Sequence, residues 1–337
     1  MLAFAACVLS FASEPEKAPV RVIFDTDIGN DVDDALALDM LYKYQDRGVV
    51  GILGILTNKD TKYAPEFVDI MNTWYGYPKI PIGKITGGVV QDDYVNYAES
   101  VCLLNDVHGK PLFDRSMKRY DKLLPSHILY RKLLSEQPDN SVVIITVGFS
   151  TNIARLLDTP GDKYCGLTGR DLVAKKVRLL SIMGGDFIEK PRAEFNIVND
   201  IPSARKLFSE WPGKVVVSPF AVGKAIKFPA SVILNDFKWN IPHPMVEACM
   251  HYRPMPYDRP TWDLTSVLYA VEGAEGYFGV SEPGTVSVTD DGHTVFTPSP
   301  DGKHVILSVD KEQAAKVKEH FIGIIKTKPE RIRAITE

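Results

Sequence analysis

An acidic segment joins a strand to a helix near the start of the chain. Residues 20–24 form a short, mostly apolar run rich in β-branched side chains, which predicts a strand. The next ten residues carry five aspartates and no lysine or arginine, in the order Asp25-Thr26-Asp27-Ile28-Gly29-Asn30-Asp31-Val32-Asp33-Asp34. The apolar run from Ala35 then predicts a helix with Asp33 or Asp34 in its first turn. This order places carboxylates at the carboxyl end of a strand, the edge of an α/β sheet where ligands bind.

The crowding of like charges in this segment predicts a bound cation. Carboxylates a few Å apart repel one another, so the cluster persists in a folded protein only if protons are retained or a cation compensates it. The ligands on offer are oxygens, with no His or Cys nearby, which favours Ca²⁺ or Mg²⁺ over zinc. The alternative is a solvated acidic loop, since capping and the helix dipole also favour aspartate at a helix start.

Two known acidic motifs differ from this spacing. An EF-hand loop beginning at Asp25 needs Gly and Glu at positions 30 and 36, where the chain has Asn30 and Leu36. A phosphotransferase strand of the haloacid-dehalogenase type fits better, with Asp25 as nucleophile and Asp27 as acid and base. Gly29 stands where that motif has Thr or Val, so this interpretation is the runner-up.

Strand-like and helix-like runs alternate along the rest of the chain. The pattern predicts an α/β fold with a mostly parallel, Rossmann-like sheet covered by helices on both faces. The turns Asp291-Gly292 and Asp301-Gly302 predict a small antiparallel β-hairpin appendage near the C-terminus. The expected strands are 20–25, 49–57, 80–85, 141–147, 176–183 and 214–218, and the expected helices are 33–45, 63–75, 125–136, 151–158 and 202–210. No linker or repeat divides residues 20–330, which predicts a single domain.

Composition indicates a small-molecule partner. The chain has 337 residues, of which 45% are hydrophobic, enough for a large core. Its net charge is -4 and its basic residues are scattered, so no surface for nucleic acid or an anionic membrane is expected. Cys102, Cys165 and Cys249 have no metal-type spacing and indicate no disulfide framework.

The first residues resemble an export signal. Residues 1–13 are mostly apolar and contain Ser10-Phe11-Ala12, a small-x-small pattern that predicts a truncated signal peptide. The run is far shorter than the roughly 20 residues that span a bilayer, so no membrane span is expected. Phe4-Ala5-Ala6-Cys7 suggests an alternative lipoprotein cleavage site. We expect a periplasmic or secreted protein, or a cytoplasmic one if this segment is not a signal.

The acidic segment and the helix start that follows closely resemble the N-terminal signature of the nucleoside hydrolase superfamily, the inosine–uridine-preferring type and its relatives. Four further motifs resemble that family in the same order, namely residues 51–58, residues 143–154, Met183-Gly184-Gly185 with residues 193–196, and Pro260-Thr261-Trp262-Asp263-Leu264. Five ordered motifs make the resemblance specific. It implies hydrolysis of N-glycosidic bonds in ribonucleosides, which releases base and ribose, by a homo-oligomer, a dimer or a tetramer.

The resemblance also implies the roles of particular residues. It implies a Ca²⁺ ion bound by Asp27, Asp34, Asp263 and the Val147 carbonyl, with Asp27 as the general base for a metal-bound water. It implies that the sugar hydroxyls are held by Asp33, Asn58, Glu194 and Asn196. Structural readings compete with these roles, because Asn58 suits a turn and Asp263 suits a helix cap.

The chain departs from the inosine–uridine branch where the base would leave. The segment between Asp27 and Asp33 is two residues longer, and Trp262 stands where that branch has a histidine proposed to protonate the base. Tryptophan is no general acid, but it can stack on a purine or on a sugar face, which makes Trp262 a candidate substrate contact. His108 and His251 are the candidates for the missing proton donor, and a site with no such donor is the other option.

Three functions are consistent with these features. The leading one is a calcium-dependent N-ribohydrolase acting on nucleosides. The second keeps the metal site but takes a non-nucleoside glycoside or another carbohydrate derivative, which Trp262 and an exported location favour. The third is a carbohydrate- or nucleoside-binding protein that has lost turnover.

Overall fold

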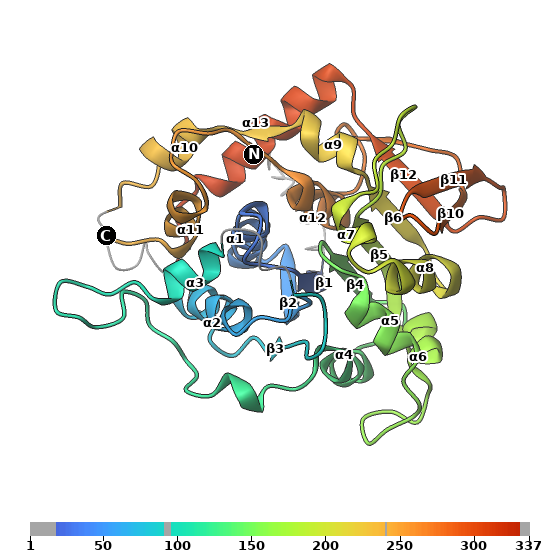
Figure 1. The fold of residues 1–337 in the computed structure, drawn as a ribbon, viewed down its shortest axis with the longest axis horizontal. Coiled ribbons are helices and arrows are strands. Elements are labelled where there is room, and N and C mark those ends of the chain that lie inside the picture. Colours follow the sequence, from blue (N-terminus) through green and yellow to red (C-terminus); the bar gives the residue numbers. More distant parts are fainter. Residues whose placement is uncertain (1–17, 91–95, 240, 331–337) are drawn as a thin grey trace, which may run out of the picture.

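The order of the strands places the acidic segment near the middle of the sheet. The computed structural model describes residues 18–90, 96–239 and 241–330, and in it β1 (Val20–Thr26) lies between β2 (Val50–Thr57) and β4 (Val142–Thr146). The chain adds β3 beyond β2 on one side and β5, β6 and β12 beyond β4 on the other (Figure 1). The winding therefore reverses at β1, and in open α/β sheets ligands bind at such a switch point, outside the carboxyl ends of the strands.

The remaining strands complete this sheet and a separate two-stranded pairing of β7 with β8. Their bounds are β3 (Ile82–Gly83), β5 (Val177–Met183), β6 (Val215–Ser218), β7 (Lys227–Phe228), β8 (Arg259–Pro260), β9 (Gly279–Val280), β10 (Gly284–Val288), β11 (Thr294–Pro298) and β12 (His304–Ser308). The expected strands at 20–25, 49–57, 141–147, 176–183 and 214–218 are confirmed to within one residue at each end, while the strand expected over 80–85 is only two residues long.

Helices cover both faces of the sheet, as the alternating pattern predicts (Figure 1). Side chains of a strand point to opposite faces in turn, so Val143 and Ile145 of β4 join one core while Val142 and Ile144 join the other. The helices are α1 (Asp33–Asp46), α2 (Tyr63–Tyr75), α3 (Tyr97–Cys102), α4 (Ser126–Ser135), α5 (Thr151–Leu157), α6 (Gly169–Lys176), α7 (Phe195–Val198), α8 (Ile201–Glu210), α9 (Phe220–Ala225), α10 (Ala230–Asn235), α11 (Pro244–Tyr252), α12 (Trp262–Glu272) and α13 (Lys311–Ile325). Helices α1, α2, α12 and α13 pack on the first core, and α4, α5, α6 and α8 on the second.

The C-terminal strands extend the main sheet. Strands β10 and β11 form the antiparallel hairpin that the Asp291-Gly292 turn predicts. Strand β12 pairs antiparallel with β10 and parallel with β6, which attaches the hairpin to the parallel strands. The appendage is therefore confirmed, and its inner strand is also an integral part of the sheet.

The register of the central strands brings distant residues to one edge. Asp25 pairs with Leu56 of β2 and with Thr146 of β4, and Thr26 pairs with Thr57. The residues that directly follow these three strands therefore emerge side by side at the carboxyl edge. They include Asp27 after β1, Asn58 after β2 and Val147 after β4.

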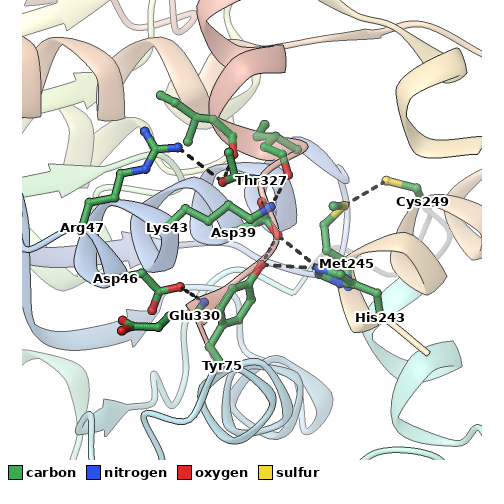
Figure 2. Close-up of polar contacts among 12 residues, drawn as sticks. Asp39, Lys43, Asp46, Arg47, Tyr75, His243, Met245, Cys249, Thr327 and Glu330 are labelled. Atoms are coloured by element: carbon green, nitrogen blue, oxygen red, sulfur yellow. Dashed lines mark hydrogen bonds and ion pairs between the residues drawn. The ribbon is translucent and has the colours of Figure 1, made fainter. Parts of the chain in front are cut away.

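A buried polar network ties α1 to the C-terminal end of α13 (Figure 2). Lys43 forms an ion pair with Asp39 at 2.7 Å and donates a hydrogen bond to the Ile325 carbonyl. The Tyr75 hydroxyl donates to Asp39, and His243 Nε2 lies 3.5 Å from the same carboxylate. Lys43 and Asp39 are almost completely buried, so this network fixes the position of α1, the helix that begins at the acidic segment.

Two expectations concern the membrane and the N-terminus. Within the described ranges, no helix combines the length and the apolar character that crossing a bilayer requires. The predicted signal peptide at residues 1–13 lies outside the described residues.

Candidate active site

A cavity of about 400 Å³ opens at the carboxyl edge of the central strands. Its wall combines three kinds of side chain. Six carboxylates line it, namely Asp27, Asp31, Asp33, Asp34, Glu194 and Asp263. Aromatic side chains and three arginines complete it, namely Phe195, Phe220, Tyr252, Trp262, Arg192, Arg253 and Arg259. A concave site where aromatic side chains lie beside convergent charged groups suits a small polar molecule.

Three of the carboxylates converge from the starts of two helices. Asp33 and Asp34 begin α1, Asp263 lies in the first turn of α12, and an oxygen from each lies within 4.8 Å of the others. The Asp263 backbone N–H donates a hydrogen bond to Asp33 Oδ2 at 3.0 Å, and the Thr26 hydroxyl donates to Asp34. The helix ends thus hold together three acidic groups that are almost completely buried.

This donor set fits a divalent cation. Burial raises the pKa of Asp33, Asp34 and Asp263 well above the ordinary value, and the charges of neighbouring aspartates raise each of them further. Three buried carboxylates at this spacing repel one another when all are ionised, and a hard cation with oxygen ligands compensates that repulsion. The acidic cluster is therefore a candidate metal centre, and its three residues differ in one respect from the set expected from sequence, since Asp33 takes the place of Asp27.

Asp27 and Val147 lie beside this cluster on the cavity wall. Burial raises the pKa of Asp27 to about 7, against the effect of its backbone hydrogen bonds and of the Lys59 charge. The chain approaches Asp27 closely at Gly148, where a Cβ atom would lie 2.6 Å from Asp27 Oδ1 and 2.4 Å from Asn58 Oδ1. Glycine is thus required at position 148 for β4 to deliver the Val147 carbonyl to the site.

Glu194, the N-cap residue of the short helix α7, and Asn196 within that helix reach the same cavity. The Glu194 carboxylate accepts hydrogen bonds from the Asn196 and Gly185 backbone N–H groups, both at 3.1 Å, and burial raises its pKa to about 7. Asn196 Nδ2 donates to the Val147 carbonyl oxygen at 2.8 Å. These bonds orient both side chains. Gly185, which donates one of them, has a φ of +76°, a conformation that favours glycine.

Asn58 occupies a different place from the one implied by the resemblance. It is fully buried and does not line the cavity. Its Nδ2 donates to Asp25 Oδ1 at 2.9 Å and its Oδ1 accepts from the Phe149 backbone N–H at 3.1 Å. In this structure Asn58 therefore supports the loop after β4, in keeping with the structural reading of this residue, and makes no wall for a sugar.

Asp25 does not line the cavity either. Its fully buried carboxylate accepts hydrogen bonds at 2.9 Å from Asn58, Asn152 and the Tyr130 hydroxyl. Burial raises its pKa to about 7. An enclosed carboxylate with three donors cannot attack a phosphate, so the haloacid-dehalogenase interpretation is wrong.

Trp262 lines the cavity, and the two candidate histidines do not. The Trp262 Nε1–H donates to the Phe220 carbonyl at 2.9 Å, and the two rings stack with centroids 5.3 Å apart. His108 is exposed on a loop, and His251 Nδ1 lies 2.9 Å from the Glu247 carbonyl within α11. Of the described residues, therefore, neither candidate is placed to protonate a leaving group in the cavity.

Charged residues that the sequence motifs do not name also reach the site. Lys59 is buried, donates to Asn30 Oδ1 and lowers the pKa of Asp27 by its charge. Arg259 lines the cavity in an ion pair with Asp31. Both stand next to a motif, Lys59 directly after Asn58 and Arg259 directly before Pro260, and this adjacency is the signal by which sequence reasoning could have found them.

Comparisons with known proteins identify the family of the chain. The family model described as inosine-uridine preferring nucleoside hydrolase matches residues 22–317. A search of curated protein sequences finds no match. A plant nucleoside hydrolase superimposes with a TM-score of 0.68 at 18% identity, covering 94% of this chain and 99% of that one.

Two further solved structures share the fold. The inosine-uridine preferring nucleoside hydrolase from Bacillus anthracis has a TM-score of 0.64 at 17% identity, over 90% of this chain and 99% of that one. The type III effector protein XopQ, complexed with adenosine diphosphate ribose, has a TM-score of 0.67 at 14% identity, over 92% and 94% of the two chains. At these identities the superpositions show the fold, and the family model shows the family. The chain belongs to the inosine-uridine preferring nucleoside hydrolase family and is a hydrolase of N-glycosyl bonds.

Proposed function

We propose that the protein hydrolyses the N-ribosidic bond of ribonucleosides in a calcium-dependent reaction. The observation that carries this proposal is the convergence of Asp33, Asp34 and Asp263 on one point of the cavity wall. Asp34 and Asp263 belong both to this cluster and to the metal ligands implied by the family resemblance. We assign the ion to these two residues, with Asp27, Asp33 and the Val147 carbonyl around them.

The side chains that line the cavity have different roles in the proposed reaction. When bound, the cation would orient sugar hydroxyls and acidify a water molecule. Asp27 takes the proton of the attacking water, because its carboxylate lies on the cavity wall beside the acidic cluster. Glu194, Asn196 and Asp33 hold the sugar through hydrogen bonds, which fixes its reactive carbon toward that water. The base lies against the aromatic part of the wall, to which Phe220, Tyr252 and Trp262 belong.

A panel of ribonucleosides tests the proposal. Release of free ribose and free base is measured with excess calcium, with a chelator, and after calcium is added back. We expect turnover only with calcium, and a loss of about 10²- to 10⁴-fold in the Asp27→Asn variant. Asp301→Asn, on an exposed turn, is the matched control. Full activity of the Asp27→Asn variant would refute the role of Asp27, and chelator-resistant turnover would refute the role of calcium.

A second substrate class is supported by the arginines. Arg192 and Arg253 also line the cavity, and the effector with a similar fold was crystallised with adenosine diphosphate ribose. A ribose or other carbohydrate derivative that carries an anionic group suits this combination of aromatic and positively charged side chains. Adenosine diphosphate ribose in the same assay separates the classes. Release of free adenine from it, with none of the plain nucleosides cleaved, favours the derivative, and binding of either compound without release identifies a binding protein.

A further inference from the structure

The two departures from the inosine–uridine branch meet in space. Asp31 lies in the longer segment between Asp27 and Asp33, and Arg259 lies three residues before Trp262. Arg259 Nε donates to Asp31 Oδ1 at 2.7 Å, and its Nη2 donates to Asp31 Oδ2. Two parallel charge-assisted hydrogen bonds fix both the position and the plane of a guanidinium group. The longer segment thus anchors an arginine beside the tryptophan that replaces the histidine.

Two aromatic rings also contact the guanidinium group of Arg259. The Arg259 Cζ atom lies 5.0 Å from the ring centroid of Tyr252 and 5.0 Å from that of Trp262. Its side chain is only 14% exposed, yet it lines the cavity. Stacking and a bidentate ion pair together leave this cation little freedom, which is the condition for preorganised electrostatic stabilisation.

The Nη1 group of Arg259 can still donate a hydrogen bond to a ligand. Asp31 engages Nε and Nη2, and among residues 18–90, 96–239 and 241–330 no acceptor bonds to Nη1. Burial disfavours the cation, but the charge and hydrogen bonds of Asp31 outweigh burial and raise the pKa of Arg259. The group is therefore a permanent positive charge at ordinary pH.

The base of a bound nucleoside belongs on this side of the cavity. The carboxylate cluster suits the hydroxyls of a sugar, whereas Phe220, Tyr252 and Trp262 form an aromatic part of the same cavity wall around Arg259. Tyr252 is a poor proton donor, because burial raises its pKa further. Among the residues that the structure describes, no histidine lines the cavity.

We propose that Arg259 is the catalytic residue that stabilises the leaving base, by its positive charge instead of by donating a proton. This inference rests on the proposed function. The bond between C1′ of the sugar and the base nitrogen breaks, and its electron pair stays on the base. The water oxygen bonds to C1′ and its proton passes to Asp27. The departing base is stabilised as an anion by Arg259 and is protonated by solvent, and Asp27 returns its proton to solvent. Asp31 is the positioning residue of Arg259.

Two substrates with different leaving groups test the proposal in the calcium-loaded protein. Inosine has a poor leaving group that needs stabilisation, whereas 4-nitrophenyl β-D-riboside releases a phenolate that leaves readily without help. We expect Arg259→Gln to lower kcat for inosine by about 10²- to 10³-fold, and the ratio of the inosine rate to the aryl riboside rate by at least about tenfold. Asp31→Asn changes the ratio in the same direction by a smaller factor. The surface variant Arg170→Gln is the matched control.

The outcomes separate this proposal from the one on which it rests. An equal loss on both substrates in a variant with wild-type melting would overturn the leaving-group role, since a structural role affects both alike. If Arg259→Gln does not fold, Asp31→Asn is the second variant, because it weakens the bidentate pair that fixes Arg259 while keeping Arg259 itself. An unchanged ratio in that variant overturns the role. Wild-type protein inactive on both ribosides would instead overturn the proposed function, and the role of Arg259 with it.

Discussion

The carboxylate of Asp33 caps helix α12 by bonding Asp263, 230 residues later in the chain. Its Oδ2 accepts a hydrogen bond from the Asp263 backbone N–H at 3.0 Å, in the first turn of α12. The N-cap residue of that helix, Thr261, makes no side-chain capping bond, so Asp33 satisfies a donor that would otherwise have no partner. This bond links the two segments that supply the acidic cluster.

Replacing Asp33 separates its capping role from its charge. An amide oxygen still accepts the Asp263 N–H, so Asp33→Asn keeps the cap and removes one of the repelling charges. Asp33→Ala loses the cap, and we expect it to be less stable than Asp33→Asn by about 1 kcal/mol. Urea unfolding in the presence of a chelator measures the difference. Equal stability of the two variants would show that the bond contributes nothing.

A methyl group at position 148 will displace side chains next to the proposed calcium site. In Gly148→Ala the new Cβ would lie 2.4 Å from Asn58 Oδ1 and 2.6 Å from Asp27 Oδ1, too close for either to stay in place. We expect a loss of about 1–3 kcal/mol in the free energy of unfolding, with weaker calcium binding by titration calorimetry. Gly323→Ala is the control, because that exposed site in α13 is open and alanine favours a helix. Wild-type calcium affinity in Gly148→Ala would contradict the proposed position of the ion.

Calcium will stabilise the protein more at pH 8 than at pH 5. The pKa values of Asp27 and Glu194 are raised to about 7 mainly by burial, so the metal-free fold binds protons more tightly than the unfolded chain does. Their contribution to stability is complete below about pH 4 and is lost as the pH rises through about 7. Calcium binds the ionised carboxylates and restores that stability at high pH.

Thermal melting with calcium and with chelator, at both pH values, measures this effect. The rise in Tm on adding calcium should be larger at pH 8, and it should shrink in Asp34→Asn and in Asp263→Asn. An equal rise at both pH values would argue against binding to these buried carboxylates.

The network around Lys43 predicts a large effect of a single truncation far from the cavity. Lys43→Met leaves the buried Asp39 carboxylate without its cation and the Ile325 carbonyl without its donor (Figure 2). We expect a loss of about 3–5 kcal/mol in the free energy of unfolding, measured by urea denaturation. The exposed Lys311→Met is the control, with a change within about 0.5 kcal/mol.

A double-mutant cycle isolates the pair itself. Asp39→Asn together with Lys43→Met should cost less than the sum of the two single changes, because the second change removes a charge that the first leaves unpaired. Additive losses would show that the two side chains are independent.

Local pattern sufficed for most of the elements. The apolar runs placed β1, β2, β4, β5 and β6 to within a residue, because central strands of a parallel sheet are buried on both faces and read as continuous apolar segments. The edge strand β3 is short, and its apolar neighbours made the expected strand too long. Short helices such as α7 could not be predicted, because a segment of four residues is too short to show helical periodicity.

The sequence alone determined the sheet, the edge of the sheet at which the aspartates gather, and the family, because these depend on local apolar periodicity and on ordered motifs. Only the tertiary structure decided which of those residues share the cavity. Asn58 and Asp25 are buried and do not line the cavity. His108 and His251 do not line it either. Arg259 lines the cavity and pairs with Asp31. These contacts join residues from 33 to 228 positions apart in the chain, and their geometry depends on how helices pack across the sheet, which no local pattern encodes.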